Sequence, residues 1–311
     1  MIGIHPVRWL RPRSTTKGTI PDIDSQMTSV VIVNYNGSEI TAQCLNSLQR
    51  FSAGVPMEII LIDNGSSDGS LQWLQREFRH LRIVSLDVNR GFGYANNAGA
   101  ETASGECLLF LNNDTEVTTD IITPMENFMA SNETVGVVGP RLLNTDGSFQ
   151  LSYGKLPSLL NECYVRYWQR QSAIGEYFKY ENVKARDIEW VTGAAMMIRR
   201  SVFERVGGFD PRFFMYFEDA DLCLRVRKAG YQVYWLPEIS LIHHRGKSRL
   251  SAPNRILEEY RKSQLYYYGK HRPRVEKLLL KIYLIMKFLP VWMKKETRDI
   301  GFGMLKIALD S

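Results

Sequence analysis

Four short apolar runs, each ending in polar or glycine-containing residues, constrain the fold of this chain most. They span residues 29–36, 58–62, 82–86 and 107–112, and segments with the apolar spacing of helices separate them. Short strands that alternate with helices are typical of an α/β fold with a mostly parallel sheet and helices on both faces. Because the carboxyl ends of parallel strands meet at one edge, the sequence predicts a ligand site along that edge, here called the rim.

The composition is that of an ordinary soluble globular protein. Of the 311 residues, 44% are hydrophobic and 23% are charged, which excludes the disordered and fibrous classes. The four cysteines form no CxxC pair: Cys44, Cys107, Cys163 and Cys223. We interpret them as small buried hydrophobic residues in a reducing compartment, with neither disulfides nor zinc implied.

The positive charge is concentrated at the carboxyl end. The formal net charge is +6, and residues 270–311 hold ten Lys or Arg against four Asp or Glu, so the preceding residues balance. Between positions 275 and 300 apolar residues are interleaved with lysines, which favours contact with a membrane surface over binding to nucleic acid. Packing of these helices on the domain or in a dimer contact is the alternative. A spanning helix is not predicted, because no run of about 20 apolar residues occurs.

The first 26 residues contain three arginines but no apolar segment of the kind found in secretory signals. We therefore expect a cytoplasmic protein. Met27 directly precedes the first predicted strand. Residues 1–27 are predicted to form a flexible extension, or to result from a start codon assigned too early.

Asp114 is the first candidate for ligand binding. It follows the buried run 107–112, directly after Asn112 and Asn113. A carboxylate at a strand end, preceded by two amides, is placed to hold a hard cation through oxygen atoms. The alternative is an Asx turn, in which Asn113 or Asp114 bonds only the following backbone.

Glu218 and Asp219 form a second candidate group. They begin a predicted helix that ends at Gly230, directly after the apolar segment FFMYF. Apolar rings beside a carboxylate raise its basicity, which suits a general base. A favourable interaction with the positive end of the helix dipole is the alternative.

Two histidines follow another apolar run. Residues 239–242 end at His243 and His244, and the cations Arg245 and Lys247 come next. A neutral imidazole can complete the coordination of a divalent metal, while a cation can balance phosphate charge. The alternative is a pair of half-exposed histidines in a basic turn.

The stretch between these groups is less regular. Residues 161–180 are rich in tyrosine and charge, and we interpret them as a helix or loop over the rim that binds an acceptor. Order returns at residues 188–199. There the small residues Gly193, Ala194 and Ala195 permit close approach of another group to the backbone.

Seven motifs follow one another along the chain: VVIVNYNG, LIDNGSSDGS, NRGFGYANN, LLFLNNDTEV, VTGAAMMIRR, GGFDPRFFMYFEDADLCLRVRKAGY and HHRGKS. In this order and spacing they resemble the inverting family 2 glycosyltransferases with the GT-A fold, in particular the bacterial rhamnosyltransferase-like branch. The resemblance runs from about residue 28 to residue 270. It implies a nucleotide-sugar-binding catalytic domain at 28–250, followed by a helical, basic and amphipathic region at 251–311.

The resemblance also implies roles on the donor side. The residues expected to hold the pyrimidine are Asn34, Tyr35, Asn36 and Asp63, with Asp63 accepting from the ring N–H. The residues expected to border the ribose and diphosphate are Asn89, Gly91 and Gly93. Gly193 and Ala194 would line the pocket of the donor sugar.

Asn113 and Asp114 stand where the family has its D-x-D type motif. Asp114 would therefore bind Mg²⁺ or Mn²⁺, with His243 as the second protein ligand. Asn112 and Asn113 replace acids that many relatives carry, so we expect metal binding to depend on the substrate phosphates. Asp219 would be the catalytic base, with Glu218 beside it.

The resemblance implies transfer of a sugar, with inversion, from a nucleoside-diphosphate sugar to a glycan or lipid-linked saccharide in cell-surface polysaccharide synthesis. The expected donor is dTDP-rhamnose, and UDP-linked hexoses or galactofuranose are alternatives, because uracil and thymine present the same N–H to Asp63. We expect an enzyme at the inner face of the membrane. A non-catalytic nucleotide-sugar-binding protein and a sugar-nucleotide pyrophosphorylase are the alternatives from other classes, although VNYNGSEI replaces the loop that a pyrophosphorylase needs.

Overall fold

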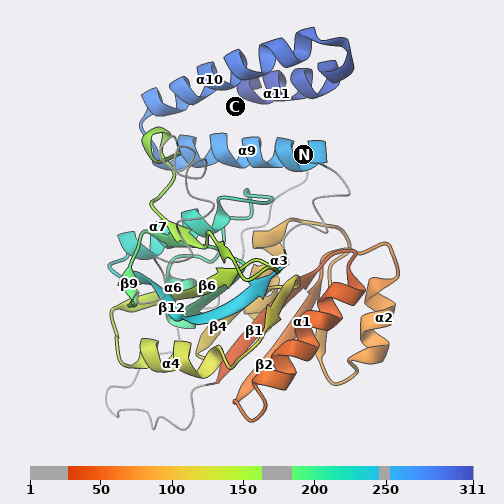
Figure 1. Cartoon of the computed structure of the whole chain (residues 1–311), viewed down its shortest axis with the longest axis vertical. Coiled ribbons are helices and arrows are strands. Elements are labelled where there is room, and N and C mark those ends of the chain that lie inside the picture. Colours follow the sequence, from red (N-terminus) through yellow and green to blue (C-terminus); the bar gives the residue numbers. More distant parts are fainter. Residues whose placement is uncertain (1–26, 163–183, 245–252, 311) are drawn as a thin grey trace.

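The computed structural model describes residues 27–162, 184–244 and 253–310. Its first half alternates strands and helices, as the sequence predicts (Figure 1). The elements are β1 Thr28–Asn34, α1 Ser38–Phe51, β2 Met57–Asp63, α2 Ser70–Glu77, β3 Arg82–Ser85, α3 Phe92–Thr102, β4 Cys107–Asn112, β5 Thr115–Val117, α4 Ile122–Ala130 and β6 Val135–Leu143. β1 and β4 are almost entirely buried, which explains why they are apolar without alternation.

The second half adds shorter strands and the C-terminal helices. The elements are β7 Phe149–Gln150, β8 Tyr153–Gly154, β9 Arg186–Asp187, β10 Trp190–Val191, β11 Ala195–Arg199, α6 Arg200–Arg205, α7 Glu218–Lys228, β12 Gln232–His243, α9 Pro253–His271, α10 Arg274–Met293, the 3-10 turn η3 Lys295–Thr297 and α11 Arg298–Asp310.

The described strands, apart from β8 and β10, form one mixed sheet. The main order is β3-β2-β1-β4-β11-β6-β12-β5. β3, β2, β1 and β4 run parallel to one another, whereas β11 is antiparallel to both of its neighbours. A second parallel pair is formed by β6 and β12. The predicted α/β fold is therefore confirmed, with a sheet that is mixed rather than wholly parallel.

Two apolar layers cover the faces of this sheet. Alternate residues of β1 point to opposite sides, because Val30 and Ile32 belong to one cluster and Val31 to the other. The first cluster includes Leu45 of α1, and α2 and α4 also contribute to it. The second includes Phe203 of α6, with α3 and α7 beside it. Full burial of such side chains stabilises the fold by about 1.5–3 kcal/mol each.

The order expected at residues 188–199 is present as two strands, β10 and β11, which a turn at 192–194 separates. The sequence predicts separate strands at 231–236 and 239–242, on either side of Pro237, but residues 232–243 form one strand, β12. Its register against β6 shifts between Leu236 and Ser240. Pro237, which has no backbone N–H, lies in that irregular part.

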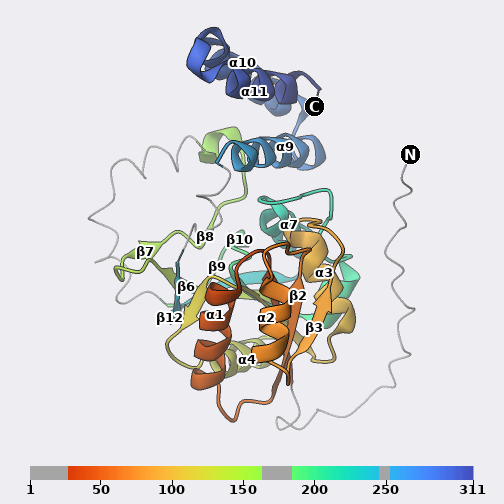
Figure 2. The same cartoon turned by 90° about the vertical axis from the view of Figure 1, so that its right-hand side faces the viewer.

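The C-terminal helices pack on the sheet domain through α9 (Figures 1 and 2). A third apolar cluster joins Phe213 and Phe217, which precede α7, to Tyr267 of α9 and to Leu284 of α10. Asp221 of α7, which is fully buried, accepts hydrogen bonds from Lys270 and His271 at 2.5 and 2.6 Å. The alternative that the C-terminal helices pack on the domain is therefore confirmed for their inner face.

Several predictions concern residues outside the described part. They are the N-terminal extension, most of the acceptor-binding segment at 161–180, Cys163 and the cations Arg245 and Lys247. The other three cysteines are buried. Within the described residues, no helix is long and apolar enough to cross a membrane.

Candidate functional site

The rim forms where β1, β2 and β4 end at the same level. Asn34 pairs with Asp63 across β1 and β2, and Val33 pairs with Asn112 across β1 and β4. β12 brings His243 to the same edge, because it pairs with β5. The structure thus gathers polar residues from four separate strands in one place, as the strand ends predict.

Asn34 and Asp63 bond each other beneath the surface of the rim. Nδ2 of Asn34 donates to Oδ1 of Asp63 at 2.8 Å, and Thr41 donates to Oδ1 of Asn34 at 2.8 Å. Asp63 also accepts from the hydroxyl and the backbone N–H of Ser66, at 2.6 and 3.0 Å. With exposed fractions of 0% and 2%, Asn34 and Asp63 shape the loop after β2. Contact of Asp63 with a pyrimidine stays a prediction.

Tyr35 and Asn36 are the exposed residues at the end of β1. Tyr35 is 41% exposed, and an exposed ring can stack on a base. Asn36 has a φ of 50°, in the left-handed region that asparagine tolerates. Its side chain accepts from the N–H of Ser67 at 2.8 Å, and its own N–H donates to Ser66 at 2.9 Å. These bonds join the loops after β1 and β2.

The loop before α3 reaches across to the segment that precedes α7. Oδ1 of Asn89 accepts from the N–H of Gly91 at 3.0 Å and from Nδ2 of Asn64 at 3.1 Å. Gly91 has a φ of 89°, and a Cβ there would lie 2.4 Å from the carbonyl oxygen of Phe214. Only glycine fits such a position. Gly93 follows in the first turn of α3.

Asp114 and His243 meet at one end of the rim. Nε2 of His243 lies 3.1 Å from Oδ1 of Asp114, and both side chains are largely buried. Burial raises the pKa of Asp114, but the hydrogen bond and charge of the His243 imidazole outweigh burial and hold that pKa below its usual value. Carboxylate and imidazole are both ligands of divalent cations. In the described parts of the chain, no third His, Cys, Asp or Glu completes such a cluster.

Asn113 points toward the start of α1. Its Nδ2 donates to the hydroxyl of Thr41 at 2.8 Å, and the Cβ position of Gly37 lies 3.6 Å from the same nitrogen. Asn113 therefore links the end of β4 to the start of α1.

The turn that precedes α7 is strained. Tyr216 and Phe217 have φ values of 70° and 68°, a conformation that side chains other than glycine rarely adopt. Such residues cluster at functional sites, where the surrounding contacts hold them. Here Ser263 of α9 donates to the carbonyl of Met215 at 2.8 Å, and the ring of Phe217 lies 5.6 Å from that of Tyr267. α9 therefore supports the start of α7.

Glu218 and Asp219 begin α7, as predicted. Oδ2 of Asp219 accepts from the N–H of Gly193 at 3.1 Å, and Oδ1 accepts from the N–H of Ala220 at 2.7 Å. Burial raises the pKa of Asp219 despite these donors. Burial, followed by the charge of Asp219, raises the pKa of Glu218 well above its usual value. Oε2 of Glu218 is buried and has no hydrogen-bond partner among the described residues.

The turn at Gly193 and Ala194 lies between the two acidic ends of the rim. A Cβ on Gly193 would lie 3.2 Å from the ring of Phe92 and 3.7 Å from Cβ of Asp219. Ala194 is 4% exposed, and its carbonyl accepts from the N–H of Asn112 at 2.9 Å. This turn therefore connects the end of β4 with Asp219.

Gln150 is a residue of the rim that the sequence did not predict. It is 2% exposed on the two-residue strand β7, and its Oε1 lies 2.6 Å from Nδ1 of His243. A single glutamine in an irregular stretch carries no sequence signal. Ser66 and Thr41, which bond Asp63, Asn34 and Asn113, were also not predicted.

Residues 29–207 match the family model described as glycosyl transferase family 2. This match covers more than half of the chain. The chain belongs to glycosyl transferase family 2. A second family model, the N-terminal domain of galactosyltransferase, matches residues 176–246 of this glycosyltransferase.

Curated relatives agree with this family. The chain is 30% identical over 239 residues to N-acetylglucosaminyl-diphospho-decaprenol L-rhamnosyltransferase of Mycobacterium tuberculosis, across 70% of this chain and 78% of the relative. It is 28% identical over 231 residues to the low-salt glycan biosynthesis hexosyltransferase Agl10 of Haloferax volcanii, across 70% and 66%. Rhamnosyltransferase WbbL of Escherichia coli is 36% identical over 85 residues, across 27% and 32%.

Solved glycosyltransferases share the GT-A fold of this family 2 enzyme. GalNAc-T7, solved with UDP, GalNAc and Mn²⁺, has a TM-score of 0.59 at 17% identity, across 79% of this chain and 50% of that one. A mannosyltransferase from Pyrobaculum calidifontis, solved with GDP-Man and Mn²⁺, has a TM-score of 0.57 at 14% identity, across 91% and 86%. The predicted family and fold are both confirmed.

Proposed function

We propose that this family 2 glycosyltransferase moves a sugar, with inversion, from a nucleoside-diphosphate sugar to a hydroxyl of an acceptor saccharide. One observation carries the proposal: the Asp114–His243 pair and Asp219 lie on either side of the turn at 193–194. A donor bound along the rim would have its diphosphate near Asp114 and His243, here called the donor end. Its anomeric carbon would lie near Asp219, here called the acceptor end.

The donor end consists of Asp114, His243 and the nucleotide loops. Asp114 and His243 would hold Mg²⁺ or Mn²⁺ together with the substrate phosphates, since a carboxylate oxygen and an imidazole nitrogen lie 3.1 Å apart there. Held by these two residues, such a cation would supply Lewis-acid stabilisation of the charge that develops on the departing diphosphate. Tyr35, Asn36 and the loop from Asn89 to Gly93 would border the base, ribose and phosphates.

Asp219 acts at the acceptor end as the general base. Its carboxylate takes the proton of the acceptor hydroxyl while that oxygen bonds to the anomeric carbon. The bond from this carbon to the diphosphate oxygen breaks, and its electron pair leaves with the diphosphate. Attack from the opposite face inverts the anomeric centre. The raised pKa of Asp219 favours proton removal, and the N–H of Gly193 fixes the carboxylate beside the donor sugar.

The donor is dTDP-rhamnose and the acceptor is a lipid-linked saccharide in cell-surface polysaccharide synthesis. Two of the curated relatives are named as rhamnosyltransferases, and one of these names contains a diphospho-decaprenol acceptor. UDP-linked hexoses or galactofuranose are the alternative donors.

A lipid-linked acceptor places this enzyme at the inner face of the membrane, and α10 carries a surface suited to that position. Its inner side chains, such as Leu284, are buried in the third cluster. Its opposite side presents an outer stripe, 42–70% exposed: Val275, Leu278, Leu279, Ile282, Met286, Leu289 and Met293. An exposed apolar stripe of this size marks an interaction surface.

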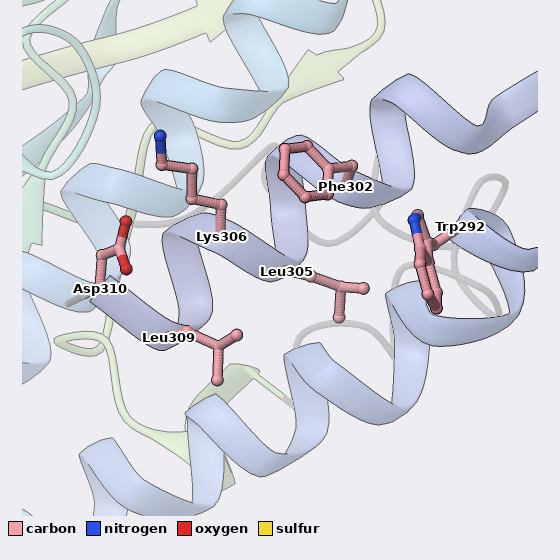
Figure 3. Close-up of a pocket in the computed structure, with 6 residues that line it drawn as sticks. All are labelled: Trp292, Phe302, Leu305, Lys306, Leu309 and Asp310. Carbon is pink, nitrogen blue, oxygen red and sulfur yellow. The ribbon is translucent and has the colours of Figure 1, made fainter.

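An apolar pocket of about 390 Å³ lies between Trp292 of α10 and one face of α11 (Figure 3). Its lining includes Trp292, Phe302 and Leu309 and contains none of the rim residues. The exposed cations of this hairpin are Arg274, Lys287, Lys294, Lys295, Arg298 and Lys306, and they outnumber its exposed acids, Glu296, Asp299 and Asp310. Anionic lipid complements these charges, whereas a second copy of the chain would present the same cations against them. We therefore propose an anionic bilayer as the occupant of the outer stripe.

Vesicle binding tests this surface. Met286→Glu places a charge in the outer stripe and should lower binding to phosphatidylglycerol vesicles at least tenfold, with little change on phosphatidylcholine. Phe51→Glu, at an exposed apolar residue of α1, is the matched control and should bind as the unmodified enzyme does. Equal binding by Met286→Glu, or its conversion of a dimer into a monomer without loss of vesicle binding, would overturn the membrane assignment.

A donor panel tests the reaction. Release of nucleoside diphosphate is measured with dTDP-rhamnose and UDP-linked sugars in Mg²⁺ or Mn²⁺, with Asp219→Asn as the inactive control. The proposal expects nucleoside diphosphate only with acceptor and unmodified enzyme. Pyrophosphate as the product would indicate a pyrophosphorylase, and donor binding without product would indicate a binding protein.

A further inference from the structure

Gln150 bonds His243 with both ends of its amide group. Its Oε1 lies 2.6 Å from Nδ1 of the imidazole, and its Nε2 donates to the backbone carbonyl of His243 at 3.1 Å. A backbone carbonyl can only accept, so Nε2 must face it. The amide oxygen is consequently the atom that faces the imidazole.

Asn144 fixes the same orientation independently. Its Nδ2 donates to the carbonyl of Phe149 at 3.4 Å and to the hydroxyl of Ser148 at 2.9 Å. Its Oδ1 is therefore free to accept, and Nε2 of Gln150 donates to that oxygen at 2.9 Å. Because Gln150 is 2% exposed, water does not compete for these bonds. Every donor in this chain of hydrogen bonds has an acceptor only when the amides point this way.

The direction of the amide determines which nitrogen of His243 carries its proton. An amide oxygen accepts only, so Nδ1 must carry the hydrogen that lies between them. In the neutral ring, Nε2 then has the lone pair. Nε2 faces Oδ1 of Asp114 at 3.1 Å, and Asn112 offers an amide nitrogen at 3.4 Å. A lone pair and a carboxylate at this distance repel each other unless a proton or a divalent cation lies between them, and both atoms are ligands that divalent cations accept.

We propose that Gln150 is a positioning residue that keeps the proton of His243 on Nδ1 and leaves Nε2 for a divalent cation. The proposal rests on the proposed function of His243 as a metal ligand, and it adds the residue that selects the ligating nitrogen. Metal-bound histidines generally donate their other N–H to a partner that fixes the ring, and loss of such a partner lowers metal affinity about 10- to 100-fold.

Imidazole ¹⁵N NMR tests the proton position without metal. In the neutral form of the ring, which the ¹⁵N shifts themselves identify, His243 of the unmodified enzyme should show a protonated Nδ1. His80, whose Nε2 lies 2.8 Å from Gln49 on the surface, is an internal reference. Gln150→Leu removes the acceptor and should let the proton move to Nε2 in part of the molecules. Protonation of Nε2 in the unmodified enzyme would overturn the proposal.

Mn²⁺ binding in the presence of nucleoside diphosphate tests the consequence, with electron paramagnetic resonance as the readout. Gln150→Leu should weaken Mn²⁺ binding about 10- to 100-fold. Gln150→Glu keeps an acceptor for Nδ1–H but loses the donor to the carbonyl of His243, so it should bind Mn²⁺ more tightly than Gln150→Leu does. Gln49→Leu removes a glutamine–histidine contact on the surface, that with His80, and is the matched control.

The outcomes distinguish the role of His243 as a metal ligand from the role of Gln150 as its positioning residue. Loss of Mn²⁺ binding in His243→Ala, with normal binding in Gln150→Leu, would overturn the role of Gln150 alone. Normal Mn²⁺ binding in His243→Ala would overturn the metal assignment and the role of Gln150 together. Loss in Gln150→Leu with recovery in Gln150→Glu, under an unchanged unfolding temperature, supports both.

Discussion

The two ends of the rim carry the same kind of side chain in opposite electrostatic surroundings. Asp114 is largely buried beside an imidazole, which outweighs burial and lowers its pKa. Asp219 lies beside a second carboxylate, Glu218, and burial raises its pKa. A carboxylate kept ionised suits cation binding, while one with raised basicity suits proton removal. The surroundings, and not the residue type, thus divide the two roles.

Asp219→Asn removes the proposed general base at the acceptor end, and we expect it to have the largest effect on turnover. General-base removal contributes about 10²- to 10⁴-fold, so turnover should fall by that factor. Nucleotide affinity should stay nearly unchanged, because the change spares the donor end. Steady-state turnover and nucleotide titration are the two measurements. Turnover equal to that of the unmodified enzyme would contradict the assignment.

Asp114→Asn tests the other carboxylate of the comparison, the one at the donor end. It removes the carboxylate from the proposed cation site, and kcat/KM should fall about 10²-fold, since Lewis-acid stabilisation contributes several kcal/mol. In contrast to Asp219→Asn, the affinity for nucleoside diphosphate with Mn²⁺ should drop toward the affinity measured in EDTA. If Mn²⁺ still strengthens nucleotide binding in this variant, the cation is bound elsewhere.

Asn113→Asp sharpens the comparison by adding a second acid to the donor end. Asn113 lies beside Asp114 and bonds Thr41, so an aspartate there adds negative charge near the proposed cation site. Mn²⁺ affinity of the nucleotide-free protein should rise about tenfold, because oxygen ligands and their charge set cation affinity. Tight Mn²⁺ binding by the unmodified free protein would contradict dependence on the phosphates.

Glu218→Gln separates the two adjacent carboxylates and should change turnover least, within about threefold. Glu218 has a folded-state pKa well above 4.5, so the folded protein binds its proton more tightly than the unfolded chain. Its stabilising contribution is complete below 4.5 and is lost as pH rises through the folded pKa. Glutamine lacks this dependence.

Thermal unfolding across a pH series measures this effect. The unfolding temperature of Glu218→Gln, relative to the unmodified enzyme, should rise with pH above 4.5 and stay constant below it. A difference that does not depend on pH would show that Glu218 is not a buried carboxylate with a raised pKa.

Much of the fold follows from local sequence, because buried strands and amphipathic helices have distinct periods. The strand ends also predict the rim, including Asp63, Asp114 and His243. The direction of β11 could not be predicted, because an apolar strand has the same pattern whether it runs parallel or antiparallel. The contact of Gln150 with His243 could not be predicted either. It joins residues far apart in the sequence, on β7 and β12, and such a pairing leaves no local signal.

The C-terminal helices show a second limit. The sequence shows that α10 is apolar and basic, but two opposite apolar faces cannot be ranked from spacing alone. α9 and α11 cover the face that contains Leu280, Leu284 and Phe288, and only this packing leaves the outer stripe exposed.

The configuration of the product tests the central claim most directly. If Asp219 acts as the base in a single displacement, the anomeric configuration of the transferred sugar, measured by NMR of the product, is opposite to that in the nucleotide donor. A product that retains the donor configuration would contradict the division of roles between Asp114 and Asp219.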